Sequence, residues 1–251
     1  MIAGFSVLRT HGSLRRCGMR KMTLITITVG VLFMFSQPVW AQEQSLSFNV
    51  GLFSMRGEDG RIFDDVLNEN LEVFDFNLQD FNGVSISGEW SIDIGEYLEA
   101  GVGLGYYSRS VPSVYAEFVN FDGSEVAQDF RLRISPLTLV MRFFPLTNHA
   151  DIQPYLGVGV GLFNWRYSES GEFIDFLADA EIFREQYVAD GRDLGGLILG
   201  GVRSRLTSDL TVGLEVRYQK ASGRVGIDQG FFDERIDLGG LTTEVTFQIG
   251  F

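Results

Sequence analysis

The sequence predicts an all-β fold, an eight-stranded antiparallel up-and-down barrel, and three observations support this prediction. Glycine makes up 30 of 251 residues and phenylalanine 22, whereas average proteins contain roughly 7% glycine. Several segments alternate strictly between apolar and polar residues, which is the period of a strand with one face against an apolar phase. The connections between these segments alternate between short and long.

The first 41 residues are typical of a cleaved signal peptide. Basic residues precede an apolar run of 14 residues, Met22 to Phe35, which is shorter than the roughly 20 residues of a membrane-spanning helix. Small residues before position 42 predict cleavage after Ala41, and a retained N-terminal anchor is the alternative. The predicted organisation is a signal peptide at 1–41 and a barrel domain at 42–251.

Charge and cysteine content exclude several classes of partner. The single cysteine, Cys17, lies in the predicted leader, so the exported chain contains no disulfide and no thiolate metal site. Five of the 20 basic residues lie there too, which leaves 15 basic against 33 acidic residues. A surface with this balance repels phosphate backbones, so no nucleic acid partner is expected.

Eight segments fit the strand template, and most are long enough to cross a bilayer at a tilt. The clearest is 241–251, where Val245, Phe247, Ile249 and Phe251 share one face. The other segments are 45–52, 84–94, 97–109, 128–144, 153–165, 194–206 and 210–219.

Segment 128–144 does not keep one parity. Arg131 and Arg133 occupy odd positions, Arg142 occupies an even one, and Pro136 lies between them. A β-bulge at Pro136 would place all three arginines on the polar face. We therefore predict a bulge at this proline.

Connection lengths favour a transmembrane barrel with short periplasmic turns and long extracellular loops. The short connections are 95–96, 145–150 and 207–209, and the long ones are 56–82, 111–127, 168–192 and 221–237. Aromatic residues near both ends of the strands predict two girdles at the membrane interfaces.

The polar face of the strands is predicted to line the lumen, because an arginine or lysine facing lipid at mid-bilayer costs about 2–4 kcal/mol. A soluble ligand-binding barrel is the alternative, but the mid-strand apolar face carries no charge. An eight-stranded barrel is narrow enough to be filled by side chains. We predict a closed lumen, with a narrow or gated pore as the alternative, and a lumen network of twelve residues: Glu89, Asp93, Glu99, Arg109, Arg131, Arg133, Arg142, Arg203, Arg205, Glu215, Arg217 and Glu244.

The glycine-alternating strand 155–161 and the closing segment 246–251 resemble the small outer-membrane β-barrels of the OmpA and OmpW types. The likeness covers nearly all of 42–251. It implies localisation in the cell outer membrane of a Gram-negative bacterium. It also implies that Phe251 is an assembly signal, read by the outer-membrane assembly machinery through the C-terminal strand. The periplasmic domain of OmpA itself is not expected here.

No catalysis, cofactor or metal is expected. Some small outer-membrane barrels are lipid-modifying enzymes that use a histidine. The only histidine of 42–251 is His149, in a turn predicted to face the periplasm. We therefore predict a monomer with a structural or surface-interaction role. The alternative, which the OmpW resemblance implies, is a channel for small hydrophobic solutes.

The long loops hold most of the negative charge. Segment 56–82 has eight acidic residues and two arginines, and 168–192 has seven and two. Such loops either form a repulsive solvated surface or attract cations that bridge to lipopolysaccharide, so outer-membrane lipid and lipopolysaccharide are the expected partners. Apolar residues at helical spacing predict helices that form a lid or line a ligand entry; they are Ile62, Phe63, Val66, Leu67, Leu71 and Phe74, and Phe173, Phe176, Leu177 and Phe183.

Overall fold

The computed structural model of the chain describes residues 43–120, 122–175, 181–231 and 234–251. The predicted signal peptide and its cleavage site lie outside these residues, as do Phe176 and Leu177. Within the described residues, no helix has the length and apolar character needed to cross a membrane.

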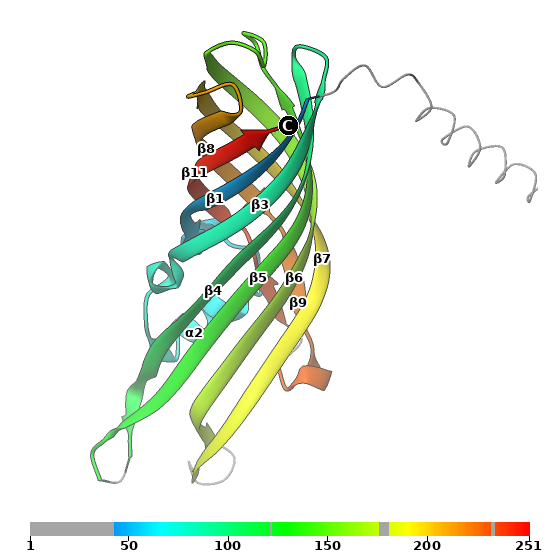
Figure 1. Ribbon diagram of the computed structural model, residues 1–251. Coiled ribbons are helices and arrows are strands. Elements are labelled where there is room, and N and C mark those ends of the chain that lie inside the picture. The colour runs from blue at the N-terminus through cyan, green and yellow to red at the C-terminus, as the bar shows by residue number, and fades with distance from the viewer. Residues whose placement is uncertain (1–42, 121, 176–180, 232–233) are drawn as a thin grey trace, which may run out of the picture. The chain divides into compact units, whose positions relative to one another are not determined.

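Eight antiparallel strands pair in a closed ring, so the predicted eight-stranded fold is confirmed (Figure 1). The ring closes because β1 pairs with β3 on one side and with β11 on the other. The strands of the ring are β1 (Gln44–Met55), β3 (Gly83–Ile94), β4 (Leu98–Val119), β5 (Glu125–Phe143), β6 (Ile152–Asp175), β7 (Glu181–Arg205), β8 (Leu210–Lys220) and β11 (Gly240–Gly250).

Short elements occupy the first and last long connections. The segments 56–82 and 221–239 are together termed the cap. The first contains η1 (Glu58–Gly60), α2 (Val66–Leu71), β2 (Phe74–Asp75) and η2 (Leu78–Phe81). The second contains β9 (Ser222–Val225), η3 (Ile227–Gln229) and β10 (Glu234–Asp237). The helical spacing in 56–82 thus corresponds to one helix of six residues, α2.

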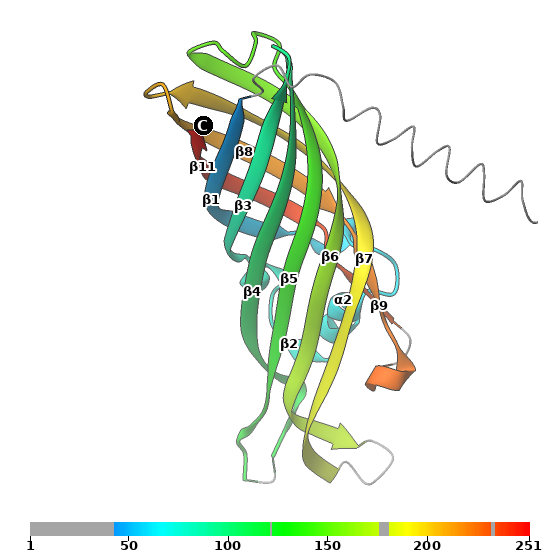
Figure 2. The same cartoon turned by 45° about the vertical axis from the view of Figure 1, so that its right-hand side comes forward.

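Four neighbouring strands are much longer than the others. β4, β5, β6 and β7 have 22, 19, 24 and 25 residues, against 11 or 12 in the rest of the ring. Their extra length forms a curved sheet, termed the extension, which continues beyond the ends of the shorter strands (Figures 1 and 2). Segments 111–127 and 168–192, predicted as loops, are therefore mostly strand.

The helix predicted around Phe173 and Phe183 is wrong. These residues are register partners in the β6–β7 hairpin, and their rings stack with centroids 5.9 Å apart. Their apolar character serves a contact between two strands rather than one face of a helix.

Strand β5 keeps one register on both sides of Pro136, so the bulge predicted at this proline is wrong. Its pairing with β6 runs without a shift from Gln128 to Phe143, and even-numbered residues face inward throughout. What changes at Pro136 is the polarity of the two faces. The inner face is polar on the short-turn side and apolar on the cap side, and the outer face shows the reverse.

On the short-turn side of Pro136 the outside of β5 is apolar, and Leu139 is 54% exposed. The inside there carries Thr138 and Arg142, both buried. On the cap side the order reverses, with Leu132 fully buried inside and Arg131 exposed outside. A barrel with a polar interior is thus continuous with a sheet whose concave face is apolar.

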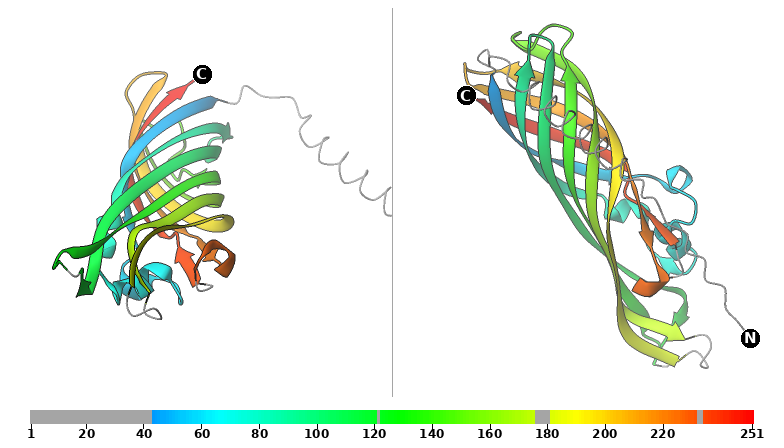
Figure 3. Two further views of the ribbon diagram at one scale, coloured as in Figure 1. Left: turned by 90° about the horizontal axis from the view of Figure 1, so that it is seen from below. Right: turned by 90° about the vertical axis from the view of Figure 1, so that its right-hand side faces the viewer.

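The concave face of the extension and the cap share one apolar core. Viewed from below, the cap segments lie over the concave side of the long strands, and β9 lies beside β7 (Figure 3). The largest fully buried side chains of this core are Phe81, Phe130, Leu132, Ile134, Phe163, Tyr167, Leu67, Ile236 and Leu238. The cap is therefore packed like a soluble domain rather than as a solvated loop.

Around the barrel, between the short turns and the extension, the outward side chains form a continuous apolar belt. Exposed leucine, valine, isoleucine and aromatic residues come from all eight strands, and they include Phe48, Ile86, Leu104, Leu139, Val158, Ile198, Leu214 and Phe247. A patch of this extent on a protein surface marks contact with an apolar phase.

Candidate functional site: the charged lumen and its cap

Arg142 is at the centre of the lumen and is bound by glutamates from three other strands. Its guanidinium donates to Glu89 of β3, to Glu99 of β4 at 3.0 Å and to Glu215 of β8 at 3.1 Å. All four side chains are at most 3% exposed. Charges buried this deeply require partners, because an unpaired one costs several kcal/mol in desolvation.

Two further arginines belong to the same network. Arg203 of β7 donates to Glu99 at 2.7 Å. Arg217 of β8 donates to Glu215 at 2.7 Å and lies 3.5 Å from Glu244 of β11. Three arginines therefore face four glutamates, and the network links β3, β4, β5, β7, β8 and β11 across the barrel.

Aromatic side chains enclose the network on the β6 side. The Tyr155 hydroxyl donates to Glu215 at 2.9 Å. The guanidinium carbon of Arg203 lies 4.7 Å from the Tyr155 ring centroid and 5.6 Å from that of Phe144. Such cation–π contacts stabilise a buried guanidinium without adding charge. The sequence analysis did not assign Tyr155 or Phe144 to the lumen, although Tyr155 has the inward parity of β6 and Phe144 shares the parity of Arg142.

Little space remains around these side chains. A Cβ on Gly101 would lie 2.6 Å from Glu89 Oε1, so only glycine leaves room for the glutamate there. The cavities on the short-turn and cap sides of the network measure about 60 Å³ and 50 Å³. Each is the size of one or two water molecules, and the charged network lies between them.

Seven of the twelve predicted lumen residues lie in this network: Glu89, Glu99, Arg142, Arg203, Glu215, Arg217 and Glu244. Asp93 and Arg205 lie nearer the short-turn end, where both line the 60 Å³ cavity. Arg109 is an inward position by parity but is exposed beside Gly83 at the end of β3, where its Nε donates to the Asp80 carbonyl at 2.9 Å.

The placement of Arg131 and Arg133 in the lumen is wrong. Both lie on the outer face of β5, because the register has no bulge and the polar face becomes the outer face beyond Pro136.

A second buried polar cluster joins the two halves of the cap. Asp237 accepts hydrogen bonds from Arg56 at 2.8 Å and from the backbone N–H of Ile62 at 3.1 Å. Asp65 is paired with Arg61 and accepts from the backbone N–H of Asp237 at 2.9 Å. Burial raises the pKa of the Asp65 carboxyl, and the Arg61 guanidinium opposes that shift. Both acids look like solvated loop charges in the sequence; the spacing of Arg61 and Asp65 by four residues was the one available signal.

A third buried group anchors α2 to the extension. Glu169 of β6 accepts from the Asn70 side chain and from the Tyr167 hydroxyl, both at 2.7 Å. Burial raises the pKa of the Glu169 carboxyl, and the two hydrogen bonds oppose the shift.

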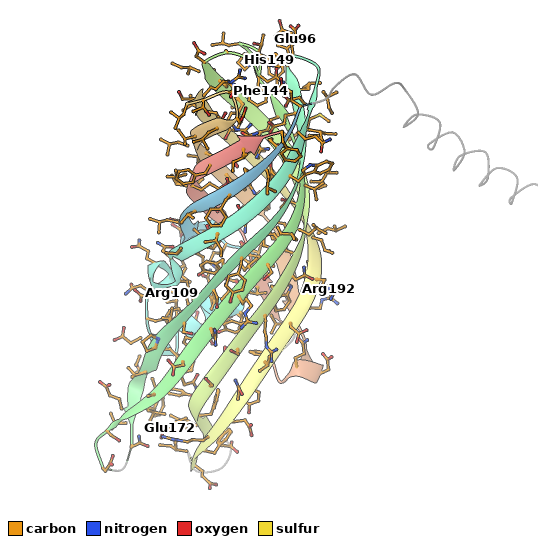
Figure 4. The ribbon with its side chains drawn as sticks, viewed as in Figure 1. Glu96, Arg109, Phe144, His149, Glu172 and Arg192 are labelled. Carbon is orange, nitrogen blue, oxygen red and sulfur yellow. The ribbon has the colours of Figure 1, made fainter. Side chains whose placement is uncertain are left out.

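His149 lies at the opposite end of the molecule, with Glu96 and Phe144 at the short turns (Figure 4). Its side chain is 49% exposed, and its Nδ1 is 4.0 Å from a Glu43 carboxylate oxygen. Within the part of the chain that the structure describes, no cluster of three or more His, Cys, Asp or Glu side chains could hold a metal.

Comparison with known proteins finds similarity in structure only. No protein-family model matches the chain, and no curated protein matches its sequence. Neisserial surface protein A is 12% identical, with 83% of this chain and 97% of that one covered at a TM-score of 0.43. The chain resembles the small outer-membrane β-barrels in its fold.

Two other structures show the same likeness. Ail of Yersinia pestis is 9% identical, with 84% of this chain and 99% of that one covered at a TM-score of 0.40. Outer membrane protein W of E. coli is 12% identical, with 84% and 98% covered at a TM-score of 0.39.

Proposed function

We propose that the chain is an integral outer-membrane barrel with a closed lumen, which holds a rigid, capped β-sheet outside the cell for surface interactions and performs no catalysis. The apolar belt supports the membrane placement, because side chains such as Leu156, 69% exposed, have no protein to cover them. The short turns then face the periplasm and the extension faces the outside.

The observation that carries the closed lumen is the saturation of Arg142 by three glutamates. An ion passing through would have to displace these contacts, and each displaced partner would be left as an unpaired buried charge. The cap closes the outer mouth a second time, since its apolar core packs on the inner face of the extension.

Ion conductance in a planar bilayer tests this proposal. The protein is purified from outer membranes in detergent, and a heat-modifiable gel shift serves as the control for folding. We expect rare or no conducting events. Steady conductance by the folded protein would show that the lumen opens, and transport would then replace the proposed role.

One observation favours the alternative of hydrophobic solute passage. An apolar depression of about 630 Å³ lies on the wall where β7–β8 pairing ends, lined by Ile62, Val160, Leu194, Gly195, Gly196, Lys220, Ala221 and Ser222. The wall behind it is closed, because a Cβ on Gly195 would lie 2.6 Å from the Ala221 Cβ. Faster entry of an apolar fluorescent solute into cells that carry the protein would support this alternative.

The predicted contact with the assembly machinery stays a proposal. Phe251 is 73% exposed at the end of β11, where its backbone N–H donates to the Gln44 carbonyl at 2.8 Å. The monomeric state is likewise a prediction, which sedimentation in detergent would check.

A further inference from the structure

The outer face of the extension carries four arginines directly beyond the apolar belt. They are termed the arginine patch: Arg131 and Arg133 of β5, Arg166 of β6 and Arg192 of β7 (Arg192 is labelled in Figure 4). Arg133 and Arg166 are direct register partners. Arg133, Arg166 and Arg192 line a shallow depression of about 310 Å³, in which Asp190 is the acidic lining residue.

The patch begins one step beyond the last apolar row of the belt. Leu137, Leu162 and Leu194 are register partners across β5, β6 and β7, and they form that row. The next outward row is Ser135, Asn164 and Arg192, and the one after it is Arg133, Arg166 and Asp190. A strand rises about 3.4 Å per residue, so outward rows follow each other at about 7 Å. The arginines therefore lie at the depth of the lipid headgroups.

The four arginines of the patch belong, with Arg109, Arg205, Arg224 and Arg235, to the described arginines that form no ion pair with a described residue. Arg142, Arg203, Arg217, Arg56, Arg61 and Arg184 each form an ion pair within the molecule. The four guanidinium groups of the arginine patch form none with any described residue. The Nε of Arg133 is buried and has no hydrogen-bond partner among these residues.

Four cations that have no ion-pair partner among the described residues and lie together on three neighbouring strands point to an anion from outside the chain. We propose that the arginine patch binds the phosphate groups of lipopolysaccharide in the outer leaflet. Arginine presents a planar set of donors that pairs with phosphate through two hydrogen bonds. The neighbouring row of leucines, on the belt side of the patch, would contact the acyl chains of the same lipid. A free phosphate has no acyl chains and could not make this contact. The inference rests on the proposed membrane placement.

The test compares two triple variants with the same change in net charge. R133Q/R166Q/R192Q removes the three arginines of the depression. The matched control, R109Q/R184Q/R224Q, removes three exposed arginines outside it. Binding is measured on the full protein in detergent micelles with purified lipid A that carries two phosphates, with the same lipid after dephosphorylation, and with inorganic pyrophosphate.

We expect the wild type and the control variant to retain bisphosphorylated lipid A. The patch variant should bind it at least about tenfold more weakly, since one lost charge-assisted contact is typically worth that much. Dephosphorylated lipid A should bind weakly to all three. Equal retention by the patch variant, or by dephosphorylated lipid A, would overturn the inference. If the protein bound inorganic pyrophosphate as tightly as lipid A, the proposal that the phosphate belongs to a lipid would be overturned.

Failure of the membrane placement is detected separately. Insertion into lipid vesicles is measured for the same three proteins before lipid A is added. A wild type that stays outside the bilayer overturns both proposals, whereas a wild type that inserts without discriminating between lipids overturns only the arginine patch.

Discussion

Arg133 and Arg142 lie on the same strand, β5, but point to opposite sides of the molecule. Arg142 is buried in the lumen among glutamates, and Arg133 lies on the outer face beside Arg166. Strand parity is uninterrupted between them, so the environments change and the backbone does not. The strand leaves the belt at Pro136, and beyond that point its apolar face packs against the cap.

Replacement of Arg142 is expected to destabilise the barrel strongly. R142Q leaves Glu89, Glu99 and Glu215 facing one another without their common cation. Breaking a buried ion pair by removing one partner costs about 3–5 kcal/mol. We expect a loss of this size in the free energy of unfolding, measured by urea titration of the protein in detergent.

The control on the same strand is R131Q, which removes an exposed arginine of the outer face. It should change the free energy of unfolding by no more than about 0.5 kcal/mol. Equal effects of R131Q and R142Q would show that the lumen network is not the source of the stability.

The barrel itself could be predicted from the sequence, because period-2 alternation depends only on local backbone geometry. Which residues of β5 face inward could not. The pattern of polar and apolar residues in 128–144 has two explanations. Either a bulge shifts the parity, or the parity is constant and the apolar face of the strand changes from the outer to the inner side. Both place Arg142 on the inner face, and they differ for the residues before Pro136, which include Arg131 and Arg133. A single sequence does not show that Phe130 and Leu132 meet the cap, since those contacts join residues far apart in the chain.

The cap was the part least accessible from sequence. Its acidic residues look solvated, yet Asp65 and Asp237 are buried and paired with arginines. A helical pattern of apolar residues also arises by chance in a hairpin, since Phe173 and Phe183 belonged to such a pattern but are cross-strand partners. Burial of charge and cross-strand pairing are tertiary properties, and they override the local pattern in both cases.

A charge introduced into the belt should destabilise the protein only through lipid. L139R places an arginine at an outward position of β5 that the proposed membrane placement turns towards lipid, where the cost is about 2–4 kcal/mol at the bilayer midplane. A127R places the same residue at an exposed position of β5 in the extension, where the change should be near zero. Folding equilibria in lipid vesicles measure both, and equal costs would contradict the assignment of the belt.

Loss of Asp237 should release the cap while the barrel stays folded. D237A removes the carboxylate that accepts from Arg56 and from the backbone N–H of Ile62. Of its acceptors among the described residues, Arg56 then keeps only the Gly60 carbonyl and the Tyr218 hydroxyl. We expect the free energy of opening the cap to fall by about 3–5 kcal/mol. Hydrogen exchange would then become faster in 56–82, with strands β8 and β11 unaffected. The exposed E72A in the same segment is the control, and equal exchange in D237A and E72A would contradict the role of the buried cluster.

The attachment of α2 is expected to weaken as pH rises, because burial holds the pKa of Glu169 above its usual value. At a pH below about 4 the carboxyl is protonated in both the docked and the released state. Between its ordinary pKa and its raised pKa, only the docked state holds the proton. The free energy of release therefore falls as pH rises through this window. Burial also raises the pKa of the Asp65 carboxyl, so Asp65 lowers the free energy of release in the same way as pH rises.

The variant E169Q separates the contribution of Glu169 from that of Asp65. Glutamine keeps an acceptor oxygen for Asn70 and Tyr167 but has no proton to lose. Exchange protection of 66–71 should therefore fall less with pH in E169Q than in the wild type, and the two should coincide at low pH. The remaining slope should vanish in E169Q/D65N. A pH profile unchanged by E169Q would mean that Glu169 is already ionised when α2 is docked, which its desolvation on the concave face argues against.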